Sequence, residues 1–77
     1  MHSIEGRLLA IAESWPLQLT VQPDQGPPWS VRVGDTARLT LRGAPIQASA
    51  LRTGQSLRVN GTLQGALGLQ ALKVEIA

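Results

Sequence analysis

Apolar and polar residues alternate along most of the chain, and this pattern constrains the fold more than any other feature. The clearest run places Leu17, Leu19 and Val21 on one face, with polar residues between them. Such alternation is typical of a strand with one buried face. Pro16 and Pro23 bound the run, and proline interrupts a strand because it lacks an N–H donor. The sequence therefore predicts a strand between the two prolines.

Four further runs show the same alternation, each separated from the next by glycine or proline. Their inward sets are Trp29, Val31 and Val33; Ala37, Leu39 and Leu41; Leu57 and Val59, with Leu63 as a further candidate; and Leu72, Val74 and Ile76. Clusters of Gly, Pro and Asp between such runs indicate turns. The chain is therefore predicted to be rich in short strands.

In the first twelve residues, apolar side chains fall on both faces of the predicted strand. Ile4 and Leu8 share one face, but the apolar residues Leu9 and Ile11 fall on the other. A long strand that bends and pairs with two partners explains such a mixture, and glycine is the usual place for the bend. We predict this bend at Gly6.

Residues 4–7 also spell Ile-Glu-Gly-Arg, the tetrapeptide that the clotting protease factor Xa recognises. Cleavage after Arg7 would have removed a tag remnant, so we interpret these residues as part of the bent strand. The sequence leaves open a vector origin for residues 1–3.

One segment breaks the alternation. Ile46, Ala50 and Leu51 recur at helical spacing, and Gly54 follows where the C-cap of a helix is expected. We predict a short helix or helical turn over residues 46–51.

We interpret the runs over residues 29–33 and 37–41 as one strand in two pieces, so the chain has five strands with one short helix between the third and the fourth. This is the element order of an OB-fold, a small, partly open Greek-key barrel. We therefore predict an all-β, five-stranded OB-type barrel, with residues 1–77 as a single domain. Closing the sheet suits a chain of 77 residues without cysteine, because closure removes free edges and wraps one core without disulfides.

Glycines and apolar residues resemble a pattern found in small bacterial OB-type domains. The matching positions are Leu51, Gly54, Leu57, Val59, Gly61, Ala71, Val74 and Ile76. Residues 4–21 also resemble the first hairpin of these domains. The resemblance implies the fold and not a chemistry, since several of these families are known only as domains of unknown function. A related small barrel that binds oxyanions such as molybdate is the alternative, but its serine-rich loop has no convincing counterpart here.

The sequence lacks the residues that catalysis and metal binding need. The chain has no cysteine and a single histidine, His2, so thiolate chemistry, a zinc site and a histidine-activated nucleophile are not expected. We predict no enzymatic activity and no cofactor. No apolar run approaches the about 20 residues of a membrane-spanning helix. We therefore expect no membrane segment and a cytoplasmic location, and the sequence leaves open export of a longer precursor.

The chain has a net charge of +2, and Lys73 is its only lysine. Arg32, Arg38 and Arg58 fall on the outward parity of their predicted strands. They are either ordinary solvated residues or the basic part of a groove for single-stranded DNA or RNA, a ligand that OB-folds often bind.

Base stacking would need aromatic side chains, and the chain has only two. Trp29 is in phase with a buried set, which favours a core position. Trp15 precedes the second strand and is either a ligand platform or a cover for the open end of the barrel. The candidate nucleic-acid-binding residues are Trp15, Arg32, Arg38, Arg58 and Asn60, together with the glycine-rich loop 60–68.

The alternative function is a protein-interaction or structural module, because the outward faces also carry Gln, Thr and Ser. Arginines gathered in one groove with Trp15 would favour nucleic acid, and scattered arginines would favour a protein partner.

Overall fold

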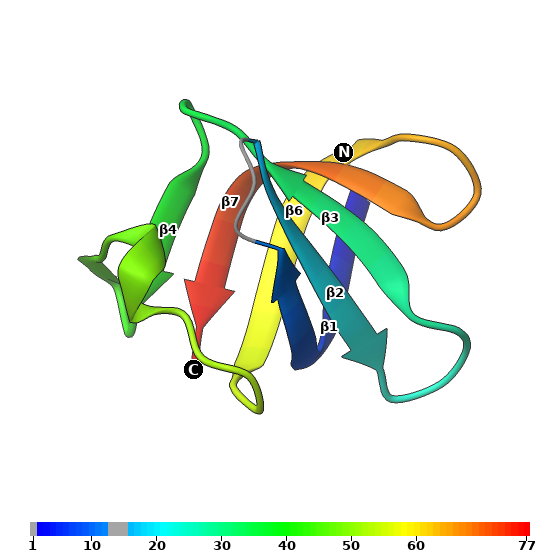
Figure 1. The fold of residues 1–77 in the computed structure, drawn as a ribbon, viewed down its shortest axis with the longest axis horizontal. Coiled ribbons are helices and arrows are strands. Elements are labelled where there is room, and N and C mark those ends of the chain that lie inside the picture. Colours follow the sequence, from blue (N-terminus) through cyan, green and yellow to red (C-terminus); the bar gives the residue numbers. More distant parts are fainter. Residues whose placement is uncertain (1, 13–15) are drawn as a thin grey trace.

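The described strands form one sheet that curls into a barrel (Figure 1). The structure is a computed structural model that describes residues 2–12 and 16–77. Its elements are β1 (His2–Ala12), β2 (Leu17–Pro23), β3 (Trp29–Val33), β4 (Arg38–Leu41), β5 (Ala44–Pro45), the 3-10 turn η1 (Ala48–Ala50), β6 (Ser56–Leu63) and β7 (Gly68–Ile76). The strand order is β3-β2-β1-β6-β7-β4-β5, and β3 also pairs with β7 in parallel. This last pairing closes a five-stranded barrel and confirms the predicted OB-type fold.

β1 is shared between two partners, as its mixed parity predicts. Its first part pairs with β6 from His2 to Arg7, and its second part pairs with β2 from Gly6 to Ala12. The two ranges overlap at Gly6 and Arg7, and at Gly6 a Cβ atom would overlap the backbone carbonyl of Gln22. Figure 1 shows β1 turning sharply between its two parts. The predicted bend and the need for glycine there are confirmed.

Two β-bulges turn two leucines toward solvent. Leu9 is skipped in the pairing of β1 with β2, and Leu72 is skipped in the pairing of β7 with β6. Beyond a bulge the inward set changes parity, so that in β1 Leu8 and then Ile11 face the core. Leu9 is 47% exposed and Leu72 is 44% exposed. The prediction that Leu72 shares the buried face of its strand is therefore wrong.

The core is made by the inward sets of the five barrel strands. The buried residues are Leu8, Leu17, Leu19, Val21, Val31, Val33, Leu51, Leu57, Val59, Leu69, Ala71, Val74 and Ile76. Trp29 packs half-buried against this cluster, which confirms its predicted core position. Leu63 lies at the end of β6 and is 45% exposed, so its predicted inward role is wrong.

The segment that joins β3 to β6 contains less helix than predicted. β4 and β5 form a small hairpin beside β7, outside the closed barrel (Figure 1). The helical part is only η1, whose C-cap is Leu51, so Gly54 does not cap it. Gly54 instead lies in a turn at φ +94° and donates its N–H to the carbonyl of Leu8 at 2.7 Å. A buried Leu51 anchors the segment and takes the place of helical packing.

Candidate functional site

An uncharged polar surface surrounds one arginine on the outer side of β2, β3 and β7. Arg32 of β3 lies directly opposite Gln18 of β2 on one side and Gln70 of β7 on the other. Opposed residues on neighbouring strands point to the same face of a sheet. Thr62 of β6 is opposite Gln70 and extends the row. We call this row, Gln18, Arg32, Gln70 and Thr62, the Arg32 row.

The connection between β6 and β7 completes a shallow hollow beside this row. The hollow has a volume of about 310 Å³, and it is lined by Gln18, Ser30, Arg32, Gln64, Leu67, Gly68 and Leu69. The backbone N–H of Ser30 donates to the carbonyl of Leu67 at 2.9 Å, which ties the connection to β3. Among the residues that the structure describes, no acidic side chain lines this hollow. It therefore offers amide groups, a hydroxyl and one guanidinium to a ligand.

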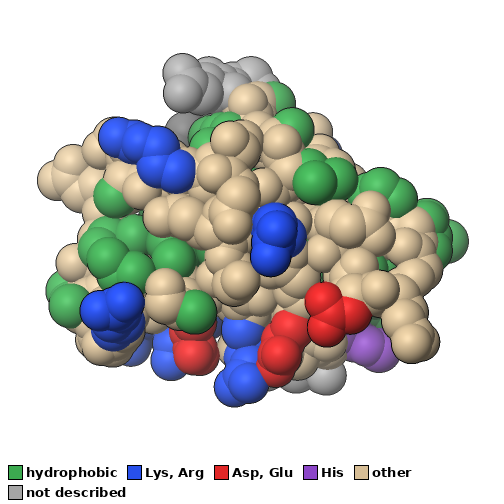
Figure 2. Space-filling model, turned by 90° about the horizontal axis from the view of Figure 1, so that it is seen from below, with side chains coloured by type: hydrophobic (Ala, Val, Ile, Leu, Met, Phe, Trp, Pro, Cys, Tyr) green, Lys and Arg blue, Asp and Glu red, His purple; other side chains and the backbone are tan. Residues whose placement is uncertain are grey.

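A second surface, on the outer side of β1, β6, β7 and β4, carries charges of both signs. The Arg58 guanidinium binds Oε1 of Glu5 through Nε at 2.8 Å and through a terminal nitrogen at 2.6 Å. Lys73 binds the Glu75 carboxylate at 3.2 Å. These side chains are all more than one-third exposed, so each pair stabilises the fold by less than about 1 kcal/mol. Figure 2 shows acidic and basic side chains side by side along one edge of the molecule.

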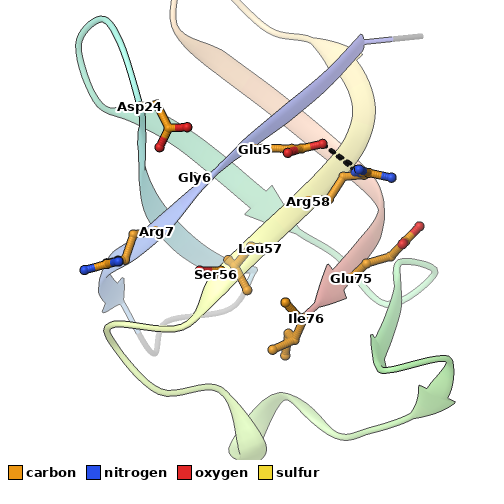
Figure 3. Close-up of a pocket in the computed structure, with 10 residues that line it drawn as sticks. Glu5, Gly6, Arg7, Asp24, Ser56, Leu57, Arg58, Glu75 and Ile76 are labelled. Carbon is orange, nitrogen blue, oxygen red and sulfur yellow. Dashed lines mark hydrogen bonds and ion pairs between the residues drawn. The ribbon is translucent and has the colours of Figure 1, made fainter.

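This charged surface contains a second hollow, which is larger than the one beside Arg32. It has a volume of about 410 Å³, and its lining includes Glu5, Arg7, Asp24, Arg58 and Glu75. Figure 3 shows that the Arg7 side chain points away from the Glu5–Arg58 pair. Because three carboxylates share this hollow with two guanidinium groups, it is a poor site for a phosphate.

The predicted site residues separate into two groups. Arg32 lies beside the last part of the predicted loop 60–68, whereas residues 60–63 of that loop belong to β6. Arg58 lies with Glu5 in the other hollow. Asn60 of β6 is opposite Lys73, which is opposite Arg38 of β4, so these three share the charged surface. The structure does not bring Arg32 and Arg58 into one groove.

Trp15 lies outside the described residues. Gln70 is a neighbour of Arg32 that the sequence pattern did not reveal, because the bulge at Leu72 changes the parity of β7 between Gln70 and its end. The outward parity of Gln18 was the available signal for the opposite neighbour.

The described residues contain no cluster of three or more His, Cys, Asp or Glu side chains that could hold a metal ion. His2 lies exposed at the start of β1, opposite Gly61. No helix in the described part of the chain is long and apolar enough to cross a membrane. Comparison with protein-family models, with curated proteins and with solved structures gives no match for this chain.

Proposed function

We propose that this chain is a non-catalytic binding module that holds single-stranded nucleic acid along the Arg32 row. The observation that carries the proposal is the position of Arg32 between two glutamines, beside a hollow whose described lining is free of carboxylates. The guanidinium would contact a phosphate, and the amides of Gln18 and Gln70 would hydrogen-bond to base edges. The function implies a compartment that holds single-stranded nucleic acid, and we place it in the cytoplasm.

The small number of basic side chains at this hollow supports an expectation of weak binding. Arg32 is the only basic side chain that lines this hollow among the described residues. The logarithm of a binding constant for a single strand falls by about 0.7 per phosphate contact for each unit of log salt concentration. We therefore expect weak binding with a shallow salt dependence, in contrast to the steep dependence of a multi-arginine groove.

The test is a titration of the protein with mixed-sequence single-stranded DNA and RNA, followed by tryptophan fluorescence and by the anisotropy of a labelled strand. Trp29 begins β3, the strand that carries Arg32, and reports on this region. Arg32→Gln should abolish binding, whereas Arg38→Gln, which removes the same charge from the charged surface, should change it little. No binding at tens of micromolar protein in low salt, or equal losses from both variants, would refute the proposal.

A protein-interaction module is the second candidate function. The observation that favours it is the separation of the arginines, since Arg38 and Arg58 lie on the charged surface and away from the hollow at Arg32. A protein ligand would use side-chain contacts on more than one face and needs no aromatic stacking platform.

A further inference from the structure

The β4–β5 hairpin presents an apolar patch that the barrel leaves uncovered. Leu41 is directly opposite Ala44 in the hairpin, and the N–H of Ile46 donates to the carbonyl of Leu39 at 3.0 Å. Leu39 and Leu41 are also opposite Val74 and Ile76 of β7, whose side chains point into the core. The four hairpin side chains therefore lie on the inner side of the sheet, but beyond the closed barrel. We call Leu39, Leu41, Ala44 and Ile46 the hairpin patch.

The outer part of this patch is open to solvent. Leu41 is 37% exposed and Ala44 is exposed, while Leu39 and Ile46 are half-buried against the core. Figure 2 shows an apolar area on the β4 side of the molecule, with basic side chains on two sides of it and an acidic side chain beside one of them. An exposed apolar area bordered by polar groups is typical of a site of protein contact.

One arginine adjoins the patch, and a second lies on the segment that follows the patch along the chain. Arg42 follows Leu41 directly, and its backbone N–H donates to the carbonyl of Ile76 at 3.2 Å. Arg52 follows the buried Leu51, and its guanidinium donates to the carbonyls of Ser49 at 2.7 Å and Leu51 at 2.9 Å. Glu75, the acidic residue in register with β4, is opposite Thr40 and faces the other side of the sheet, where it binds Lys73. The patch is therefore apolar at its centre and basic at its border.

The backbone of Arg42 gives an independent reason to look for a ligand here. Arg42 has φ +52° and Gly43 has φ +87°, so both central residues of the two-residue hairpin turn have positive φ. Such a turn strongly favours Asn-Gly over Arg-Gly, because the left-handed conformation is unfavourable for a long side chain. A residue held in an unfavourable conformation is often retained for function. Arg42 carries a positive charge, which an Asn at this position would lack.

We propose that the hairpin patch binds a short acidic segment of a partner protein, with an apolar side chain of that segment packed on Leu41 and Ala44 and its carboxylates paired with Arg42 and Arg52. Recruitment by strand addition is disfavoured at this edge, because β5 has only two residues and Pro45 has no N–H to donate. The centre of the patch consists of aliphatic side chains, which offer no hydrogen-bonding group to a base edge, and this disfavours nucleic acid. This inference concerns a different surface from the Arg32 row and does not depend on the proposed function.

The test uses synthetic amphipathic peptides of about fifteen residues, long enough for an apolar stripe at helical spacing. One peptide combines leucine with glutamate, a second replaces each glutamate by lysine, and a third replaces each leucine by alanine. Binding to the full chain is followed by the amide NMR shifts of residues 39–52. Only the leucine–glutamate peptide should bind, and its shifts should centre on the hairpin patch. Equal binding of the lysine peptide, or no shifts in the hairpin at millimolar peptide, would overturn the proposal.

Arg42→Asn separates binding from stability. This variant should raise the thermal midpoint of unfolding, because Asn-Gly fits the turn. Its affinity for the acidic peptide should nevertheless fall by roughly three- to tenfold. Ala44→Glu should lower the affinity for the acidic peptide further, because it places a carboxylate on the patch. Arg32→Gln removes the same charge from another face and should leave the affinity unchanged. If Arg42→Asn and Arg32→Gln weaken binding equally, only net charge is involved and the proposed site is wrong.

Discussion

At the scale of single residues, close backbone contact makes two glycines structurally necessary. Gly6 and Gly61 lie in strands β1 and β6, and at each position a Cβ atom would overlap a carbonyl oxygen of the neighbouring strand, that of Gln22 or of Gln70. The apolar residues on both faces around Gly6 indicated in the sequence that the strand bends there. Gly61 entered the sequence analysis only as a position of the family resemblance, because nothing in its sequence neighbourhood shows how close β7 approaches.

We predict that Gly61→Ala destabilises the protein by about 1–3 kcal/mol, the range for inserting a methyl group into a packed site. Gly34→Ala is the matched control, because its Cβ would meet only the side-chain nitrogen of Gln70 at an ordinary 3.7 Å. Urea unfolding of both variants measures the difference. Equal stabilities of Gly61→Ala and Gly34→Ala would show that β6 and β7 separate at this point without loss.

At the scale of elements, the bulges decide which leucines stabilise the barrel. Leu69 and Leu72 lie in the same strand, yet Leu69 is 1% exposed and Leu72 is 44% exposed. Leu69→Ala should destabilise by about 2–5 kcal/mol, because it leaves a cavity in the core. Leu72→Ala, the same chemical change, should alter the free energy of unfolding by less than about 0.5 kcal/mol. Similar losses in both variants would place the bulge at a different residue.

The elements also show where sequence patterns suffice and where they fail. β2 was predicted between Pro16 and Pro23 because every second residue is buried, and burial on one face leaves a direct trace in the sequence. β4 was predicted from the alternation over residues 37–41, but its hairpin with β5 was missed because the turn is Arg42-Gly43, and arginine is not a residue that signals a turn with positive φ. The predicted helix shrank to η1, because Leu51 is the only buried residue of the segment 46–51 and Ile46 is instead hydrogen-bonded to Leu39 of β4.

At the scale of the whole molecule, closure by β3 and β7 decides which candidate site residues meet. The sequence predicted Arg32 beside a loop over residues 60–68, and in the structure only the last part of that segment joins the last two strands of the barrel and lies beside Arg32. It could not show that Arg58 pairs with Glu5, because β6 meets β1 across 53 residues of chain. Alternation gives the face of a residue on its own strand, whereas the neighbour across the strand depends on register.

The whole barrel should also protect the factor Xa tetrapeptide. Arg7 is paired with Gln22 of β2 on one side and with Ser56 of β6 on the other. A protease needs an extended chain with free edges, so cleavage after Arg7 requires separation of these strands. We expect slow cleavage of the native protein by factor Xa and a faster rate in Gly61→Ala, measured by gel or mass spectrometry. Rapid cleavage of the native protein, unaffected by Gly61→Ala, would show that β1 detaches independently.

The position of β7 has a consequence for the order in which the protein can fold during synthesis. β7 pairs with β3, β4 and β6, and it is the last of the strands to leave the ribosome. Until it emerges, the growing chain has an open sheet in which β3, β4 and β6 each lack a neighbour. Such unpaired edges invite pairing with other chains. The native barrel must therefore form after translation of β7, in one late step, and a ribosome stalled before Gly68 would hold a chain exposed to aggregation.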